Sequence, residues 1–355
     1  MALDNYYLLG RSGLRVSRLA LGTMNFGTGG FHASYGRTPD QAGAIFHTYV
    51  DAGGNFVDTA DFYTAGESEE ILGKLITESA LRDKIVLTSK FTNSVEDGNP
   101  NAGGNGRKHM IRAVEESLRR LQTDYLDLFL LHTWDRITPI DEVLRTFDDL
   151  TRAGKIRYAG LSDVPAWYAA RAQNDAVPMV SLQLPYPLAE RTIETEHVAM
   201  AQTLGLGITA WSPLAGGFLT GKYRRDGGSG EGRLNAASTP TWSDRHWDLL
   251  KTLNAVADEL GVTMAQVAVN WVATQPAVAS AIVGASSPEQ LTSTMAALDF
   301  EIPPALRAEL DAASAVPAES VYRMFTPEYQ AWLVNPGAKV GDKPAGYQPP
   351  VLNWS

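Results

Sequence analysis

Four side chains that can move protons occur at or just after short apolar runs of the sequence. Asp58 lies near the end of NFVDT, Lys90 ends IVLTSK, His132 ends LDLFLLH, and Tyr63 follows Asp58 by five residues. If these runs are parallel strands, their carboxyl ends share one face. Three titratable groups at consecutive strand ends are unusual in a core and natural in a site, so the pattern predicts a proton-transfer centre.

Each of these residues also has a structural interpretation. An Asp in the sequence DTA often caps a helix, and the next segment, GESEEILGKLI, reads as a helix with acidic residues in its first turn. Taken alone, Lys90 reads as a surface lysine, His132 as a buried histidine and Tyr63 as a packed aromatic residue. One shared site explains all four together, provided that the strand ends coincide.

The elements that would position these residues alternate along almost the whole chain. Eight apolar runs read as strands buried on both faces, because they are continuous rather than alternating. They lie at residues 19–22, 55–59, 85–90, 126–132, 156–162, 181–187, 207–213 and 279–284.

Helical patterns separate the runs. One helix has Ile140, Val143, Leu144, Phe147 and Leu150 on one face, and similar spacing occurs near residues 111–121, 249–260 and 264–271. Eight strand–helix units favour a closed (β/α)8 TIM barrel. An open, doubly wound sheet is the alternative, although no G-x-G-x-x-G opens a helix after an early strand.

Three segments fall outside the alternation. Residues 6–17 read as an N-terminal β-hairpin with a turn at Ser12-Gly13. Residues 214–242 are long and Gly-rich, which predicts a lid or binding loop. Residues 315–355 are rich in Pro and Gly with interspersed aromatic residues, and we expect an irregular arm that packs over the barrel. The chain is thus expected to form one domain over residues 1–355.

Composition excludes several classes of protein. The formal net charge is −10 and there is no basic cluster, which argues against nucleic-acid and anionic-membrane partners. The chain has no cysteine, so disulfides and thiolate chemistry are absent. No apolar stretch approaches the roughly 20 residues of a membrane-spanning helix. We see no secretory leader and no metal-ligand cluster, and we expect a cytoplasmic protein.

At this point several motifs resemble the aldo-keto reductases in order and spacing. They are DTADFY with GESEEILGK, then TSKF, LDLFLLHTWD, GLSD, AWSPLAGGFLTGKY and IVGASSPEQL. The resemblance covers about residues 7–315. Within the family it is greatest to the bacterial oxidoreductase branch, which includes potassium-channel β-subunit-like proteins. The family contains monomers and larger assemblies, so a homo-oligomer is left open.

The resemblance implies an NAD(P)(H)-dependent oxidoreductase that interconverts a carbonyl compound and its alcohol. Tyr63 would be the general acid for reduction or the base for oxidation. A free tyrosine titrates near ~10, and an ammonium group beside it favours the phenolate. Lys90 would supply that ammonium, Asp58 would hold Lys90, and His132 would orient the substrate oxygen. Hydride would come from the nicotinamide, so no metal is required.

The resemblance also implies a cofactor site. Trp211 would stack on the nicotinamide, while Ser162 and Gln183 would bind its carboxamide. Residues 213–222 would close over the pyrophosphate, with Lys222 supplying charge. As structural alternatives, Trp211 is a core residue and Gly216-Gly217 a simple turn. The full expected set is Gly22, Thr23, Met24, Asp58, Ser162, Asp163, Gln183, Trp211, Ser212, Pro213, Leu214, Gly216, Leu219, Gly221, Lys222, Arg233, Gly284, Ser286, Gln290 and Thr294.

Two positions depart from the family's pattern. Asp163 stands where the family usually has Asn, and an ionised Asp accepts hydrogen bonds but donates none. Thr294 stands where Asn is frequent, and residues 284–294 offer no cation for an adenosine 2′-phosphate. Arg233 in the long loop is expected to supply that charge. NADP(H) is therefore favoured, with NAD(H) as the alternative.

The partner is expected to be a small-molecule substrate, namely a bulky carbonyl compound or alcohol. An apolar mouth is predicted from Phe26, Phe62, Phe91 and Trp134, alongside Tyr63 and His132, although some of these aromatic residues are equally suited to packing under the arm.

Three other functions compete with this one. The first is a regulatory subunit of the same fold that senses the cofactor and turns over slowly. The second is a barrel aldolase with Lys90 as a Schiff base, which Asp58 disfavours by keeping the lysine charged. A hydrolase with paired acids has only Asp163 as its second rim carboxylate.

Overall fold

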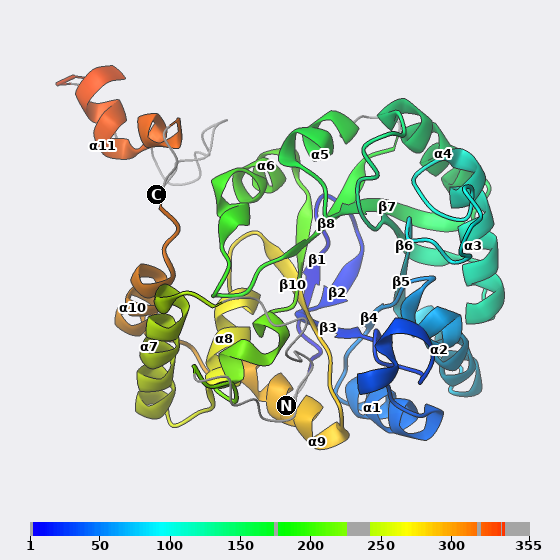
Figure 1. Ribbon diagram of the computed structural model, residues 1–355, viewed down its shortest axis with the longest axis horizontal. Coiled ribbons are helices and arrows are strands. Elements are labelled where there is room, and N and C mark those ends of the chain that lie inside the picture. Colours follow the sequence, from blue (N-terminus) through cyan, green and yellow to red (C-terminus); the bar gives the residue numbers. More distant parts are fainter. Residues whose placement is uncertain (1–2, 174–176, 226–241, 318–320, 335, 338–355) are drawn as a thin grey trace.

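A closed barrel of eight parallel strands forms the centre of the molecule (Figure 1). The computed structural model describes residues 3–173, 177–225, 242–317, 321–334 and 336–337. The strands pair in the order β10-β3-β4-β5-β6-β7-β8-β9. They are β3 (Leu19–Gly22), β4 (Phe56–Asp58), β5 (Val86–Phe91), β6 (Leu126–Leu131), β7 (Ile156–Ser162), β8 (Met179–Pro185), β9 (Gly207–Trp211) and β10 (Val278–Val283). The predicted TIM barrel is confirmed, and each predicted strand lies within two residues of its observed bounds.

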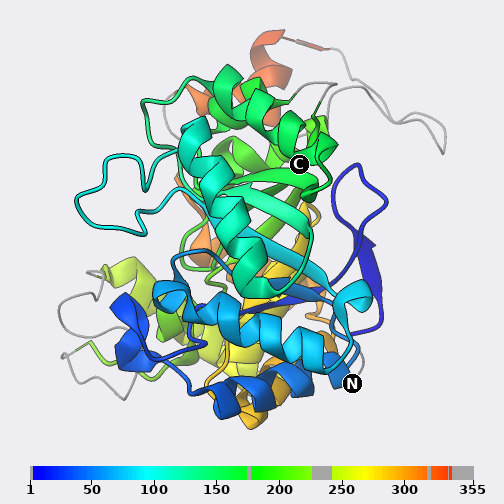
Figure 2. The ribbon, with the colours of Figure 1, turned by 90° about the vertical axis from the view of Figure 1, so that its right-hand side faces the viewer.

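The N-terminal antiparallel hairpin that the sequence predicted is present, and it covers one end of the barrel. Its strands are β1 (Tyr6–Leu8) and β2 (Arg15–Ser17). Figure 2 shows the hairpin on the right of the molecule and the long loop of residues 92–106 on the left, so the two lie at opposite ends. The carboxyl ends of the barrel strands, and with them the expected site, face away from the hairpin.

Helices form a ring around the barrel (Figure 1). Local sequence starts several of them: Thr38 and Gln41 form a reciprocal capping box on α1, as do Thr263 and Gln266 on α8. The helices are α1 (Pro39–Asp51), α2 (Glu67–Glu78), α3 (Arg107–Leu121), α4 (Ile140–Arg152), α5 (Ala166–Ala172), α6 (His197–Leu204), α7 (Asp244–Leu260), α8 (Met264–Ala273), α9 (Pro288–Met295), α10 (Pro304–Ser314) and the short α11 (Pro327–Tyr329).

Short tight helices occupy several connections. They are residues Gly30–Tyr35, Tyr63–Gly66, Arg82–Lys84, Thr192–Thr195, Ala215–Thr220, Ala296–Leu298 and Tyr322–Phe325, and a π turn covers Gln330–Val334. Among the described residues no helix is both long enough and apolar enough to cross a membrane.

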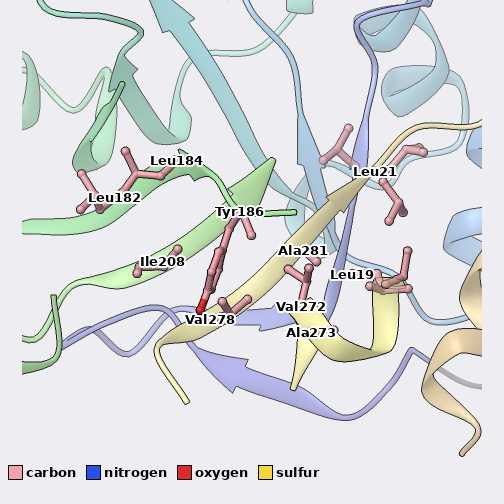
Figure 3. Packing of buried hydrophobic residues seen from close by; sticks show 14 of the residues in the cluster. Leu19, Leu21, Leu182, Leu184, Tyr186, Ile208, Val272, Ala273, Val278 and Ala281 are labelled. Carbon is pink, nitrogen blue, oxygen red and sulfur yellow. The ribbon is translucent and has the colours of Figure 1, made fainter. Parts of the chain in front are cut away.

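Side chains alternate between the inside and the outside of the barrel. On β6, Phe129 and Leu131 pack in the large outer core under the helices, whereas Leu128 and Leu130 pack in a smaller inner cluster. The hairpin neighbourhood contributes Leu9 and Val16 to that inner cluster. Figure 3 shows part of the outer core, where side chains from β3, β8, β9 and β10 lie close to those of α8. This alternation decides which strand residues reach the site.

The described part of the C-terminal arm differs from the expectation that the arm packs over the barrel, and residues 338–355 lie outside the described residues. Its described part contains short helical turns with apolar side chains that remain largely exposed, among them Phe325 (51%) and Trp332 (70%). Figure 1 shows α11 standing beyond α10, away from the barrel. A chain segment with few buried apolar contacts gains little from packing, so the described part of this arm adds little to the core.

Candidate active site

Three residues from neighbouring segments form a buried chain of hydrogen bonds at the carboxyl end of the barrel. The ammonium Nζ of Lys90 lies 2.6 Å from Asp58 Oδ1 and 3.2 Å from the phenol oxygen of Tyr63. It also donates to the carbonyl oxygen of Thr59 at 2.8 Å. These three acceptors use all three ammonium hydrogens. The lysine is therefore fixed in one orientation, with the phenol as one of its fixed partners.

Lys90 is charged in this environment. Burial favours the neutral amine, but the Asp58 carboxylate and the Tyr63 oxygen outweigh it and raise the pKa of Lys90 above its ordinary value. The side chain has no exposed surface. A buried ammonium held next to a phenol can stabilise the phenolate, which is the chemistry that a tyrosine acid or base needs.

His132 lies beside Tyr63 with its ring edge-on, the two ring centres being 5.9 Å apart. Its Nδ1 is 3.5 Å from the Asn93 side chain, a long contact. Burial, together with the positive charge of Lys90, lowers the pKa of His132 well below its usual value. The imidazole is therefore neutral at neutral pH and offers one donor and one acceptor to a substrate oxygen.

The opposite side of Asp58 is held by β8. Gln183 Nε2 donates to Asp58 Oδ2 at 2.9 Å, so both carboxylate oxygens are bonded. Inward positions on adjacent strands bring Ser162 and Trp211 to the same rim. Ser162 Oγ is buried and has no hydrogen-bond partner among the described residues. An unpartnered buried hydroxyl of this kind fits a ligand group that supplies the missing partner.

Asp163 follows Ser162 directly and turns its carboxyl toward Trp211. Asp163 Oδ1 accepts a hydrogen bond of 3.0 Å from Trp211 Nε1. The backbone at Asp163 is left-handed, with φ of 46°, which asparagine and aspartate tolerate better than most residues. Burial raises the pKa of Asp163 to about 6, against smaller opposing effects from Trp211 and Lys90.

The segment after β9 makes a compact turn in which two glycines have left-handed backbone conformations. Gly216 and Gly217 have φ of 66° and 97°, and the Gly216 N–H donates to Ser212 Oγ at 3.2 Å. Lys222 passes close by, because a Cβ atom on Gly217 would lie 2.9 Å from its Cε. Lys222 is exposed and forms no ion pair with a described residue. This combination of glycines and one available cation suits an anionic group.

Other residues of this turn contribute mainly backbone. Pro213 and Leu219 are buried, and Leu214 and Leu219 are bonded to each other through the main chain. Gly221 has φ of 76° and packs against Met264.

The β10–α9 connection forms a second turn. Ser286 donates from both its backbone N–H and its hydroxyl to Gln290 Oε1, and Thr294 Oγ1 bonds to the Gln290 carbonyl. Thr294 is thus used within α9, while Gly284, Ser286 and Gln290 are exposed. Arg37 donates to the Ser286 carbonyl at 3.0 Å.

The connection after β3 completes the rim. Gly22 leaves room for Ile282, because a Cβ atom there would lie 2.9 Å from Ile282 Cγ2. Thr23 is fully buried and bonds to the Asp58 carbonyl and Ser68, so its hydroxyl is already satisfied. Met24 is half-buried.

Two of the four residues expected at the substrate mouth do not reach it. Phe26 and Phe91 have no exposed surface and belong to the outer core. Phe91 follows the inward-pointing Lys90 by one residue, so it points to the other face of the barrel wall. Phe62 is half-buried, with its ring centre 5.4 Å from that of His132, and Trp134 packs against the exposed Trp167.

Arg233, which was expected to bind the 2′-phosphate, lies outside the described residues. Four residues at or near the site were not predicted from the sequence: Thr59, Asn93, Arg37 and Asp61. Thr59 acts through its backbone carbonyl, for which no sequence signal exists. Asn93 and Arg37 lie in irregular segments, where spacing gives no direction. Asp61 is 2% exposed, with neither carboxyl oxygen bonded to a described residue. It lies two residues before Tyr63 in the sequence, and nothing in the sequence distinguishes it from a surface acid.

An eight-stranded parallel barrel with buried Asp58, Lys90 and Tyr63 at its carboxyl rim is typical of a class of oxidoreductase. Comparison with known proteins agrees: the aldo/keto reductase family model matches residues 18–315. This chain therefore belongs to the aldo/keto reductase family.

Its relatives include proteins with different names. It is 37% identical over 312 residues to the "Uncharacterized oxidoreductase YrpG" of Bacillus subtilis (strain 168), covering 84% of this chain and 92% of the relative. It is 36% identical over 310 residues to a "Probable voltage-gated potassium channel subunit beta" of Oryza sativa subsp. japonica, covering 83% and 91%. It is 33% identical over 298 residues to "Aryl-alcohol dehydrogenase GME11368" of Pestalotiopsis microspora, covering 81% and 76%. Family and relatives together support a carbonyl/alcohol oxidoreductase.

Proposed function

We propose that this protein interconverts an aldehyde or ketone and the corresponding alcohol with NADP(H), using Tyr63 as the proton donor and acceptor. The observation that carries the proposal is the Lys90 ammonium, which bonds Asp58 at 2.6 Å and Tyr63 at 3.2 Å in a fully buried position. That arrangement serves a phenol that must gain and lose a proton, and it has no comparable use in a core.

The residues divide the work between them. Asp58 keeps Lys90 charged, and Lys90 stabilises negative charge on the Tyr63 oxygen. During reduction Tyr63 gives its proton to the substrate oxygen, and during oxidation it takes the proton back. Neutral His132 orients the same oxygen by a hydrogen bond. The nicotinamide, when bound, supplies or accepts the hydride.

The cofactor site is proposed from groups that the fold leaves available. The unpartnered Ser162 hydroxyl and Gln183 would hold the nicotinamide carboxamide, and Trp211 would lie against the ring. Gly216, Gly217 and Lys222 would receive the pyrophosphate. We keep NADP(H) as the preferred cofactor, with Arg233 as the expected partner of its 2′-phosphate.

The substrate is proposed to be an aromatic or other apolar alcohol or carbonyl compound. Phe62 lies against His132, and Trp134 extends the aromatic surface toward Trp167. One relative is named as an aryl-alcohol dehydrogenase, which points in the same direction.

A regulatory subunit is the second candidate, because relatives from two plants are named as probable potassium channel β subunits. The buried Asp58–Lys90–Tyr63 chain argues against a pure sensor, which needs no proton relay.

A cofactor titration and a substrate panel test the proposal together. Tryptophan fluorescence is measured while NADPH or NADH is added, and Trp211→Phe serves as the control for ring stacking. Turnover is then measured with aromatic and aliphatic aldehydes and alcohols. Saturable quenching with turnover supports the enzyme, whereas tight binding without turnover on any substrate favours the sensor. Absence of binding by the folded protein contradicts both.

A further inference from the structure

Asp163 places a carboxyl group just after β7, against the ring of Trp211. Its Oδ1 accepts from Trp211 Nε1 at 3.0 Å, and its Oδ2 has no hydrogen-bond partner among the described residues. The side chain lies at the end of β7, directly after the unpartnered Ser162 hydroxyl. Asp163 therefore presents a free carboxylate oxygen beside the ring of Trp211 and at the edge of the proposed nicotinamide site.

The charges around Asp163 do not cancel. The cation that acts on the Asp163 carboxyl is Lys90 on β5, and it is already paired with Asp58 on β4 at 2.6 Å. His132 after β6 is neutral, because burial and Lys90 lower its pKa well below the usual value. Tyr63 is neutral as a phenol and adds further negative charge as a phenolate. Asp163 has no cation within salt-bridge distance in the described residues. When Asp163 is ionised, these five groups together therefore carry at least one negative charge in excess.

A nicotinamide ring is cationic when oxidised and neutral when reduced. A net negative rim attracts the first form and is indifferent to the second. We propose that Asp163 makes this site bind the oxidised cofactor in preference to the reduced one. This inference rests on the proposed function, because it requires that the nicotinamide lies against Trp211.

The preference is expected to depend on pH. Burial raises the pKa of Asp163 to about 6, so the group is mostly neutral at pH 5 and mostly ionised at pH 7.5. Since the oxidised ring favours the ionised carboxylate, its binding must in turn lower that pKa and release protons near pH 6. The adenosine 2′-phosphate is common to both cofactor forms, so its own titration cancels in the ratio of their dissociation constants.

The test compares binding rather than turnover. Dissociation constants for NADP⁺ and NADPH are measured by fluorescence or calorimetry at pH 5 and pH 7.5. We expect the ratio Kd(NADPH)/Kd(NADP⁺) to rise by about fivefold over this range, which corresponds to one unit of coupled pKa shift. Asp163→Asn keeps an oxygen acceptor for Trp211 and should abolish the rise. Asp258→Asn, at an exposed position on α7, should leave it unchanged.

The outcomes separate the two proposals. A ratio that is independent of pH in the wild type and unchanged in Asp163→Asn contradicts the role of Asp163, even if both cofactors bind. A folded protein that binds neither cofactor contradicts the proposed function itself. The wild-type pH series stands without the variant, so the inference is tested even if Asp163→Asn does not fold.

Discussion

At the scale of single residues, the site depends on how the Lys90 ammonium shares its hydrogens. Its three contacts, to Asp58, Thr59 and Tyr63, lie between 2.6 and 3.2 Å. The lysine has no freedom to serve as a nucleophile, because an amine that is held charged is unreactive. This geometry disfavours the aldolase that the sequence left open.

Lys90→Met removes the ammonium and keeps an apolar stem of similar length. We expect turnover to fall by about 10²–10⁴-fold, the usual contribution of proton transfer by a positioned group. The remaining alcohol oxidation should need a higher pH, because the phenolate loses its stabilising charge. A pH–rate profile of kcat measures this. Loss of activity with an unchanged profile would contradict the role and indicate a structural defect.

Much of this residue-level account could be predicted from the sequence. Asp58, Lys90, His132, Gln183 and Trp211 all come at strand ends, and the structure brings them to one rim. The prediction that Phe91 lines the substrate mouth was wrong, because strand residues alternate and one step along β5 changes the face of the barrel wall. The role of Thr59 could not be predicted, because it is the backbone carbonyl of Thr59 that accepts the hydrogen bond from Lys90.

At the scale of elements, the connection from β4 to α2 holds Tyr63 in place. Thr64, Ala65 and Gly66 follow it in left-handed conformations, with φ of 49°, 59° and 95°. Two of them are not glycine, so this bend could not be predicted from residue type. Behind the connection, Glu69 pairs with Arg120 at 2.7 Å and accepts from Ser89 at 2.5 Å. Partners 51 and 20 residues apart cannot be matched from spacing alone.

Asp61 makes this connection sensitive to pH. Burial, and then the nearby Glu69, raises the pKa of Asp61 well above its ordinary value. The unfolded chain ionises this group near pH 4, but the folded chain resists ionisation. The wild type therefore loses stability as pH rises above about 4, until the pH reaches the folded-state pKa.

Asp61→Asn should lack this loss. The free energy of unfolding of the variant should therefore gain on that of the wild type between pH 4 and pH 8, because only the wild type has a carboxyl group whose pKa is raised on folding. Urea denaturation across this range measures the difference, and Asp97→Asn is the exposed control. A constant difference at all pH values would show that Asp61 is ionised and paired in the folded state.

At the scale of the whole molecule, the two ends of the barrel have separate roles. The carboxyl end holds the site, and the hairpin closes the other end with Leu9 and Val16 in the inner cluster (Figure 2). The barrel, its strand order and the hairpin followed from continuous apolar runs and turn residues. The exposure of the described part of the arm could not be predicted, because the presence of aromatic residues in a sequence does not show what they pack against.

Gly10→Ala tests this separation. Gly10 has φ of 57°, and a Cβ atom there would lie 2.4 Å from the Val180 carbonyl and 2.7 Å from that of Gly205. We expect a loss of about 2–4 kcal/mol in the free energy of unfolding, since strain and overpacking add. Gly13→Ala, which meets nothing within 4 Å, should cost far less. Thermal unfolding measures stability, and kcat should stay unchanged at a temperature where the variant is folded. A large fall in kcat would contradict independent ends.

The measurement that tests the central claim most directly is hydride transfer by Tyr63→Phe in a single turnover, with cofactor binding measured on the same sample. The variant loses one oxygen, and Lys90 keeps Asp58 and Thr59 as partners, so the fold and the cofactor site should remain. We predict cofactor affinity within a few-fold of the wild type and a rate lower by at least about 10²-fold. Full hydride transfer by Tyr63→Phe would contradict the account and remove the phenol from the reaction.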